Sequence, residues 1–385
     1  MLPEIDPTDP EVLRDPFTAH NAAREASPVA RLLVPGFPMW MATRLAEGRT
    51  VLSDPRFAPS AGSFQGIPGV PDEYRPYLRT MAEMSGDEHR RIRRLAGPAF
   101  TARRAADFRP RIERIVDALL DAAPDDLLTG FALPLPMEVI CELVGIPVAD
   151  RPRWRLHGAA VAAGDILAFA EAVPELVEGA RRAVAARRAE PADDLLTDLI
   201  SATAEGIEPL SDDEVVTTVW HLVLAGQVPT HLVANGLFEL HRHPGQLAIL
   251  RARPELMPGA VEELTRWCGP QLLSVPRFTQ EDVELGGVPI PAGQPVTVSI
   301  AGANRDPRAF ADPDRLDVTR TDAGGHLGYA HGPHFCLGAA LSRVEVAAAL
   351  TGVLNRAPDL PFAEEPRYLP DGGTLRLASL RVAAA

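Results

Sequence analysis

The sequence contains no lysine, so all 38 of its basic side chains are arginines. Acidic residues outnumber them, and the formal net charge is −14. This argues against nucleic acid as a partner, because phosphates must be met by a cationic surface. The three cysteines, Cys141, Cys268 and Cys336, are far apart and odd in number. They predict no disulfide framework and fit a reducing compartment.

Long apolar runs are also missing. No stretch reaches the roughly eighteen apolar residues that a membrane-spanning helix needs. The first ten residues, MLPEIDPTDP, are acidic and rich in proline, unlike a signal peptide or an anchor. We therefore expect no membrane association and a cytoplasmic location. A chain of 385 residues ordinarily suggests two or three domains, but no linker or internal repeat divides this one.

Helical patterns dominate the chain. We expect helices over residues 86–123 and 150–190, from Ser211 to about residue 240, over about 258–268, and directly after Cys336. Ser211 and Glu214 have the spacing of a capping box, and Pro229 lies in the middle of the apolar helix that follows. Residues 283–290 and 295–300 have strand and turn signals. The prediction is a mainly α protein with a small β region.

The stretch HLGYAHGPHFCLG, residues 326–338, combines histidines with Cys336. Zinc binds both residue types, but no second nearby cysteine or metal-binding helix accompanies them; a surface loop with incidental histidines is the other alternative. Because Cys336 precedes a helix, free backbone N–H groups can stabilise its thiolate, the form that binds metals. Gly332 and Gly338 would allow a flat macrocycle to approach closely.

The extended stretch GYAHGPHFCLGAALSRVE resembles the haem-binding loop of the cytochromes P450, whose pattern is F-G-x-G-x-H-x-C-x-G. The matching positions are Gly332, His334, Cys336 and Gly338, while Tyr329 and Ala330 replace the phenylalanine and the first glycine. The resemblance implies the cytochrome P450 fold as a single domain over residues 1–385. It also implies haem b, with Cys336 as the axial ligand of its iron and Gly338 beside it.

Two further motifs agree with this resemblance. In VEELTRW, Glu263 and Arg266 have the i, i+3 spacing of an ion pair, and the family uses such a pair to support the haem loop. In SGDEHRRIRRL, a solvated basic face is the simpler interpretation. The family instead binds the haem propionates, whose carboxylates favour charged donors, through residues that correspond to His89, Arg93, Arg277 and His334.

The long helix departs from the family pattern. LVLAGQVPTHL stands where members usually have A-G-x-(D/E)-T, with Ala225 and Gly226 matching. Val228 and Pro229 replace the acid and the alcohol that relay protons. Pro229 crowds the carbonyl of Ala225 and can free an acceptor for water. We expect a changed relay, in which Gln227, Thr230 or the substrate itself supplies protons through ordered water.

Two reactions fit this site. One is oxidative coupling of aromatic side chains in a small peptide, which the lost relay favours slightly because such substrates carry acidic protons. The other is hydroxylation of a bulky lipophile such as a macrolide or terpenoid. Residues 64–84 are similar to actinobacterial enzymes that cross-link short peptides. Pocket candidates, for which core packing is an equal alternative, are Tyr77, Met81, Met84, Leu273, Val275 and Leu375.

The resemblance also implies partners. Electrons should come from NAD(P)H through a ferredoxin and its reductase, because the length leaves no room for a reductase domain. A basic docking face could include Arg103, Arg104 and Arg343, although each can simply be solvated. Two alternatives remain: a catalytically silent relative that binds another biosynthetic enzyme, and a haem isomerase or dehydratase that uses no dioxygen.

Overall fold

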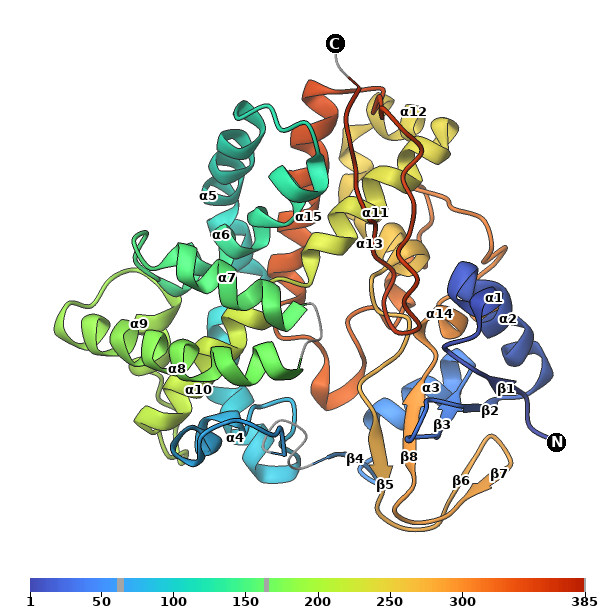
Figure 1. The fold of residues 1–385 in the computed structure, drawn as a ribbon, viewed down its shortest axis with the longest axis horizontal. Helices are drawn as coiled ribbons and strands as arrows, with labels where there is room; N and C mark the ends of the chain where they lie inside the picture. The colour runs from blue at the N-terminus through green and yellow to red at the C-terminus, as the bar shows by residue number, and fades with distance from the viewer. Residues whose placement is uncertain (61–65, 163–165, 384–385) are drawn as a thin grey trace.

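The computed structural model describes residues 1–60, 66–162 and 166–383. Helices form most of it, and a small sheet lies at one end (Figure 1). The helices are α1 Pro10–Arg14, α2 Pro16–Ala26, α3 Leu45–Ser53, α4 Gly86–Ala96, α5 Ala102–Asp121, α6 Pro134–Val144, α7 Arg151–Ala162, α8 Ile166–Ala189, α9 Leu195–Ile200, α10 Asp212–Ala225, α11 Pro229–Arg242, α12 Pro244–Ala252, α13 Met257–Cys268, α14 Ile300–Ala303 and α15 Ala339–Arg356.

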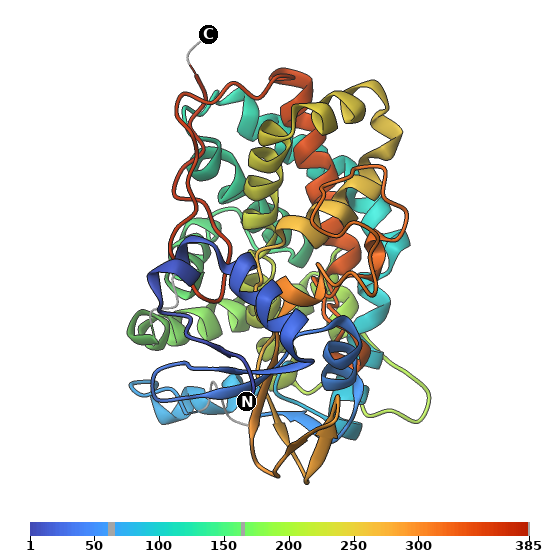
Figure 2. The same cartoon turned by 90° about the vertical axis from the view of Figure 1, so that its right-hand side faces the viewer.

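The strands come from two separate stretches of the sequence, residues 4–59 and 277–298. They are β1 Glu4–Ile5, β2 Val29–Leu32, β3 Met39–Ala42, β4 Phe57–Pro59, β5 Arg277–Thr279, β6 Val283–Leu285, β7 Val288–Ile290 and β8 Pro295–Val298. Six of them form one sheet in the order β1-β2-β3-β8-β5-β4, and β6 pairs with β7 in a separate hairpin. Figure 2 shows both at the lower end of the molecule, below the helices. The expected mainly α fold with a small β region is confirmed.

A large apolar core joins α5, α11, α13 and α15 with the C-terminal segment, and a second packs α6, α8 and α10 together. α15 packs along α5 and also contacts α11 and α13. In Figure 1, α15 runs through the middle of the helical part. The segment before α15, which holds Cys336, is therefore attached to a helix that packs against three others.

Two predicted helices are divided in the structure. The helix expected over 86–123 breaks at Gly97–Phe100, a 3₁₀ turn that contains Pro98. The prediction over 150–190 is met by α7 and α8 in its described parts, and residues 163–165 lie outside the described residues. The long apolar helix ends at Ala225 and restarts at Pro229 as α11. Pro229 cannot donate a backbone hydrogen bond, so this division follows directly from the sequence.

The start of α10 confirms the capping box. Glu214 N donates to Ser211 Oγ at 3.3 Å, and Ser211 N donates to Glu214 Oε2 at 2.8 Å. The three acidic residues of this first turn also bind three different elements. Asp212 pairs with Arg188 of α8, Glu214 pairs with Arg91 of α4, and Asp213 accepts a bond from the loop before α4. This end of α10 is therefore fixed.

Candidate functional site

Cys336 lies between a 3₁₀ turn, Gly332–His334, and the start of α15. Its N–H donates to Tyr329 O at 2.9 Å, and its own carbonyl accepts from Ala339 N at 3.3 Å. The residue is exposed, unlike the buried Cys141 and Cys268. Burial raises the pKa of the Cys336 thiol above its usual value, while two nearby arginines act in the opposite direction. Such a sulfur can bind a metal that displaces its proton.

The glycines of the loop have separate roles. Gly332 has φ of +70°, and a Cβ there would come within 2.9 Å of Leu52 O, so its close approach is to protein backbone. Gly338 has an ordinary φ of −82°, and a Cβ there would meet no atom within 4 Å. Ala330 adopts φ of +61°, a conformation that alanine enters only at a steric cost. Its replacement of glycine therefore strains the loop.

Basic side chains from three elements gather beside this loop. They are His89 and Arg93 of α4, Arg277 of β5, and His334. The two imidazole rings stack at 4.0 Å. Arg93 Nη1 donates to Phe335 O at 2.9 Å and Arg277 Nη1 to Phe57 O at 3.3 Å. Within the described ranges neither arginine has an acidic partner. The structure therefore brings together all four predicted propionate-binding side chains.

The pKa values of His334 and Arg277 are lowered, as expected for basic groups enclosed without an acidic partner. Burial, followed by His89 and the two arginines, lowers the pKa of His334 to about 3. Burial also lowers the pKa of Arg277 to about 10. Each shift disfavours the charged form, as expected when cations are enclosed without a counter-ion. A bound group with two negative charges would stabilise the charged forms and raise these pKa values again.

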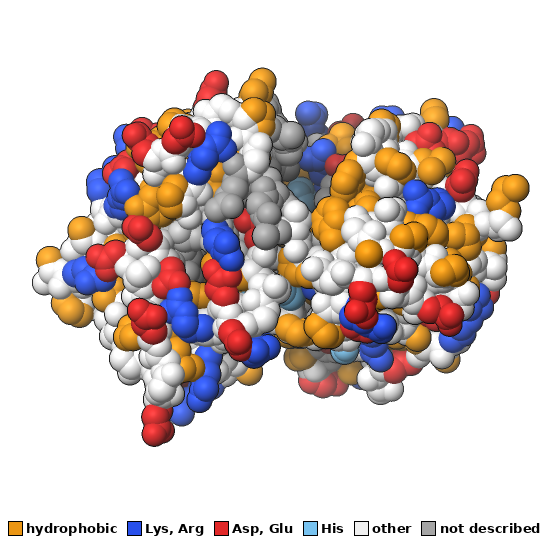
Figure 3. Space-filling model, turned by 90° about the horizontal axis from the view of Figure 1, so that it is seen from below, with side chains coloured by type: hydrophobic (Ala, Val, Ile, Leu, Met, Phe, Trp, Pro, Cys, Tyr) orange, Lys and Arg blue, Asp and Glu red, His pale blue; other side chains and the backbone are white. Residues whose placement is uncertain are grey.

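A hollow of about 430 Å³ is lined by His89, Arg277 and His334, together with Phe57 and Ser85. Figure 3 shows the underside of the molecule, where a groove separates the side of α8–α10 from the side of the sheet, with histidine atoms visible inside it. Cys336 is not among the residues that line this hollow, but His334, two residues before it, is. The Cys336 sulfur and these basic groups fit haem, which needs an axial ligand and partners for two carboxylates.

Behind the cysteine loop, Glu263 and Arg266 form the predicted ion pair. Both side chains are 0% exposed, with contacts of 2.7 and 2.8 Å. Arg266 also donates to carbonyl oxygens of the segment before the cysteine loop, those of Asn304, Pro313 and Arg315. Glu263 in turn accepts from Asp317 N at 2.9 Å. The pair therefore holds that segment in place.

The break between α10 and α11 is a turn of residues 226–228. Val228 N donates to Ala225 O at 3.4 Å, and Thr230 N donates to Gln227 O at 3.2 Å. Thr230 thus skips the Gly226 carbonyl, which has no backbone donor among the described residues. The freed acceptor is Gly226 O, one residue beyond the Ala225 carbonyl that we predicted. Val228 is 43% exposed and Thr230 is buried.

The six pocket candidates lie in different surroundings. Tyr77 is 5% exposed and packs in the core. Its hydroxyl donates to Asp213 Oδ1 at 2.7 Å and accepts from Arg181 of α8 at 2.5 Å. Met84 and Leu375 are also buried, whereas Met81 and Leu273 are half-buried and Val275 is 75% exposed. Residues 64 and 65 of the stretch similar to peptide cross-linking enzymes lie outside the described residues.

The three candidate docking arginines differ in their exposure and in their ion pairs. Arg343 is half-buried and binds both carboxylate oxygens of Glu262. Arg104 pairs with Asp198 at 3.0 Å. Arg103 is 91% exposed, with only a loose 3.9 Å contact to Asp107. Arg343 is therefore held by Glu262 while still 34% exposed, and Arg103 is the most accessible of the three.

Two features were missed at the sequence level. Glu262 binds both His326, at 3.3 Å, and Arg343. Tyr329 and Ser342 form a hydroxyl pair at 3.2 Å. The only sequence signal was that tyrosine replaces phenylalanine in the loop. Within residues 1–60, 66–162 and 166–383, no group of three or more His, Cys, Asp or Glu side chains is placed to hold a metal ion.

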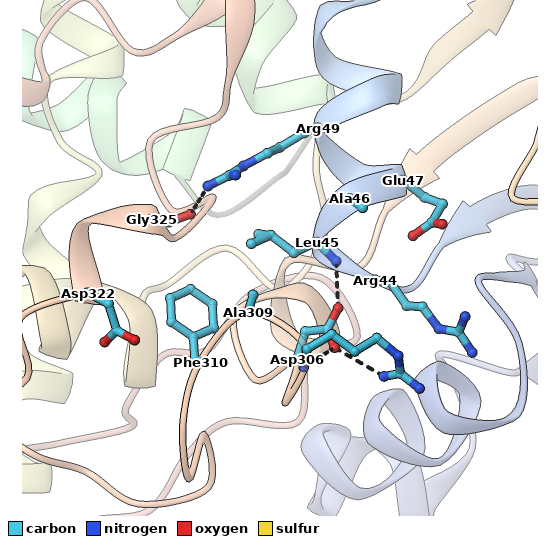
Figure 4. A pocket seen from close by; sticks show the side chains of 11 residues that line it. Arg44, Leu45, Ala46, Glu47, Arg49, Asp306, Ala309, Phe310, Asp322 and Gly325 are labelled. Atoms are coloured by element: carbon cyan, nitrogen blue, oxygen red, sulfur yellow. Dashed lines mark hydrogen bonds and ion pairs between the residues drawn. The ribbon is translucent and has the colours of Figure 1, made fainter.

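Another hollow, of about 440 Å³, lies where α3 begins. Figure 4 shows two of its charged side chains bound by neighbours: Asp306 accepts from Leu45 N, and Arg49 donates to Gly325 O. It lacks the sulfur donor and the unpaired cations of the cysteine site. We assign the chemistry to the cysteine site.

Comparison with known proteins agrees with this assignment. The family described as Cytochrome P450 matches residues 250–357. Cytochrome P450 107B1 of Saccharopolyspora erythraea is 38% identical over 383 residues, covering 95% of this chain and 93% of the relative. Mycinamicin IV hydroxylase/epoxidase of Micromonospora griseorubida is 40% identical, covering 89% and 88%. The solved structure of CxnD, titled a cytochrome P450 enzyme for C-S bond formation in chuangxinmycin biosynthesis, is 33% identical, with a TM-score of 0.85 over 100% of this chain and 99% of that one.

Proposed function

Because the chain belongs to the cytochrome P450 family and is therefore an oxidoreductase, we propose that it oxidises a small-molecule natural product at a haem b held by Cys336. The observation that carries this proposal is that Arg93, which has no acidic partner among the described residues, binds the carbonyl next to Cys336, while Arg277, His89 and His334 line a hollow beside the same loop. One domain, residues 1–385, would hold the whole site.

Each group of the site would have a defined task. Cys336 Sγ would bind the iron, and His89, Arg93, Arg277 and His334 would bind the propionates through charge-assisted hydrogen bonds. Haem with a thiolate ligand activates dioxygen, because the ligand donates electron density that favours cleavage of the O–O bond. Glu263 and Arg266 would keep the loop in register without touching the cofactor.

Proton delivery is the step in which this chain departs from its family. Neither Val228 nor Pro229 can hold a transferable proton. The Gly226 carbonyl lacks its helical donor, so it can orient a water molecule. In our proposal, the protons come from the side chain of Gln227 or Thr230, or from the substrate itself. Ordered water at the break between α10 and α11 carries them.

The variant Pro229→Thr tests this relay, with Pro229→Ala as the control that restores the backbone N–H without a hydroxyl. Restoring the alcohol should change the fraction of electrons that end in product, and the alanine control should change it less. Unchanged coupling of electrons to product in Pro229→Thr would contradict an altered relay.

Of the two reactions, we place oxygen insertion into a bulky natural product first. Its support is the likeness to a mycinamicin hydroxylase/epoxidase over most of both chains. Oxidative coupling is the second candidate. The missing acid and alcohol favour it, and a structural relative is named for C–S bond formation. The preference for peptide cross-linking made from the sequence remains a hypothesis.

Titration of the ferric enzyme with two panels separates these candidates. One panel holds short peptides with tyrosine or tryptophan, and the other holds macrolides and terpenoids. A ligand that displaces the axial water shifts the Soret band. A shift with macrolides or terpenoids alone supports oxygen insertion into a bulky lipophile, whereas a shift with peptides alone favours coupling. Product formation without electrons or dioxygen would refute both reactions and support an isomerase or dehydratase.

Electrons would come from NAD(P)H through a ferredoxin and its reductase. Of the predicted docking arginines, Arg103 is the most accessible, so we place it at the ferredoxin interface. No described helix is long and apolar enough to cross a membrane. We propose a cytoplasmic enzyme, consistent with the free thiols of Cys141 and Cys268 in the core.

A further inference from the structure

His231 is the titratable side chain nearest in sequence to the break between α10 and α11. Within Pro229–Leu240 of α11, it alone is not buried. An amide such as that of Gln227 or a hydroxyl such as that of Thr230 can pass a proton on, but each must then be resupplied. An imidazole can take up and release protons near neutral pH, so His231 is the group at this break that could resupply them.

The turn at the break places His231 on the same side as Val228. Val228 N donates to Ala225 O at 3.4 Å, an i→i+3 bond of the 3₁₀ type, and side chains three residues apart eclipse in such a turn. Ala225 is exposed and Val228 is 43% exposed. His231 follows three residues later and is half-buried. These three residues therefore form one line of accessible side chains along the break.

The C-terminal segment, residues 371–376, is bound to the face of α11 that carries His231. Asn235, one helical turn after His231, donates through Nδ2 to Leu375 O at 2.8 Å. Side chains four residues apart share a helix face, so His231 also faces this segment. His231 Nδ1 is enclosed, and no described residue forms a hydrogen bond with it. Because enclosed polar atoms rarely lack partners, this nitrogen is a place for ordered water.

Two charged groups of the C-terminal segment, Arg376 and Asp371, act on the imidazole. They pair with each other at 3.1 Å, and their side chains are 29% and 24% exposed, so solvent reaches them. Burial lowers the pKa of His231 below its usual 6.5, Arg376 acts in the same direction, and Asp371 acts in the opposite one. The ring is therefore neutral at pH 7, with one nitrogen that can accept a proton and one that can donate.

We propose that His231 carries protons from the solvent beside Asp371 and Arg376 to the ordered water at the break between α10 and α11. Oxygen insertion places one oxygen atom in the product and releases the other as water, which takes up two protons and two electrons. For each proton delivered, the ring accepts one from solvent water at one nitrogen and releases one from the other, so its charge is restored. His231 would thus resupply Gln227 and Thr230. The inference rests on the proposed function, whose electrons come from NAD(P)H.

The test compares His231→Gln with His241→Gln in the haem-loaded enzyme. His241 is a half-buried histidine near the other end of α11, with its ring 4.9 Å from that of Phe362. The substrate is the compound of the two panels that shifts the Soret band. One readout is the fraction of electrons that ends in product, measured across the pH range in which the enzyme stays folded. The other is an NMR titration of the histidine rings in the diamagnetic ferrous carbon monoxide complex, where the His231 signal is the one that His231→Gln removes.

In the wild-type enzyme the fraction of electrons in product should fall as the pH rises, with the midpoint that NMR gives for His231. His231→Gln should lower this fraction several-fold below that midpoint and remove its pH dependence, whereas His241→Gln should keep both. Asp371→Asn removes the group that raises the pKa of His231, so it should move the NMR midpoint to lower pH.

Three results would each overturn the proposal for His231. They are an unchanged pH dependence in His231→Gln, an equal loss in His241→Gln, and an NMR midpoint that Asp371→Asn does not move. A wild-type enzyme that lacks a thiolate-type Soret band, or that forms product without electrons, would instead refute the proposed function, and the inference with it.

Discussion

Replacing Arg266 by methionine should destabilise the protein strongly. The change removes a guanidinium that makes two contacts to Glu263 and donates to three backbone carbonyls, with both charged side chains fully buried. Glu263 would keep only Arg320, at 3.2 Å, and the Asp317 amide. Leaving one partner of a buried ion pair without the other typically costs about 3–5 kcal/mol.

The expected change in melting temperature follows from chain length. With about 2.1 cal/mol/K of unfolding entropy per residue, a chain of 385 residues has about 0.8 kcal/mol/K, so the loss corresponds to about 4–6 °C. Scanning calorimetry of the haem-loaded protein measures it, with haem content recorded for each variant. The contacts to Asn304 and Pro313 lie before the cysteine loop, so we also expect lower haem content.

Arg356→Met is the matched control. Arg356 pairs with Asp117 and Asp121 at the surface of α15, and its side chain is 37% exposed. Exposed pairs of this kind contribute about 0–1 kcal/mol. If Arg266→Met lowered the melting temperature no more than Arg356→Met, the supporting role that we assign to the buried pair would be wrong.

Three further predictions concern single residues of the site. Arg277→Gln should weaken haem binding by about 1.5–3 kcal/mol, or roughly 10–100-fold, because it removes a charged hydrogen-bond donor; haem transfer to an apo-globin measures this, and an unchanged rate would contradict it. Burial alone would raise the pKa of Glu262, but bonds from His326 and Arg343 lower it to about 2 from 4.5. This carboxylate therefore stabilises the fold above pH 4.5 and loses that contribution as the pH falls towards 2. Glu262→Gln should therefore make the free energy of unfolding less dependent on pH in this window. An unchanged pH dependence would count against the pairing. Ala330→Gly should raise stability by about 0.5–1 kcal/mol, because relief of left-handed strain of about 1–2 kcal/mol exceeds the added chain entropy of about 0.4–1 kcal/mol; a lower midpoint in denaturant would refute this.

Several residues of the candidate site could be predicted because their motifs are local or keep fixed spacings. Cys336 and His334 share one loop, and Glu263 and Arg266 share one helix face. Arg277 and His89 come from distant segments, and only the family resemblance could place them together. The structure confirms that His89 lies against His334.

Contacts between distant segments could not be predicted. Tyr77 was a pocket candidate because of its place in the chain, but its hydroxyl is bound by Asp213, 136 residues away. Arg343 is a candidate for partner docking, and its pairing with Glu262, 81 residues away, is a second contact that the sequence does not indicate. Nothing in local periodicity encodes such pairs. The division of the long helix, in contrast, was signalled by Pro229, although continuous apolar residues on both sides favoured a single helix.

The central claim is that the thiolate of Cys336 holds haem iron, and the carbon monoxide difference spectrum of the reduced protein tests it most directly. The wild-type enzyme should show the long-wavelength Soret band that thiolate ligation produces. Cys336→Ser should lose that band, whereas Cys268→Ser, at a buried cysteine in the core, should keep it. A thiolate-type band that persists in Cys336→Ser, or that is missing from the wild-type protein, would contradict the account.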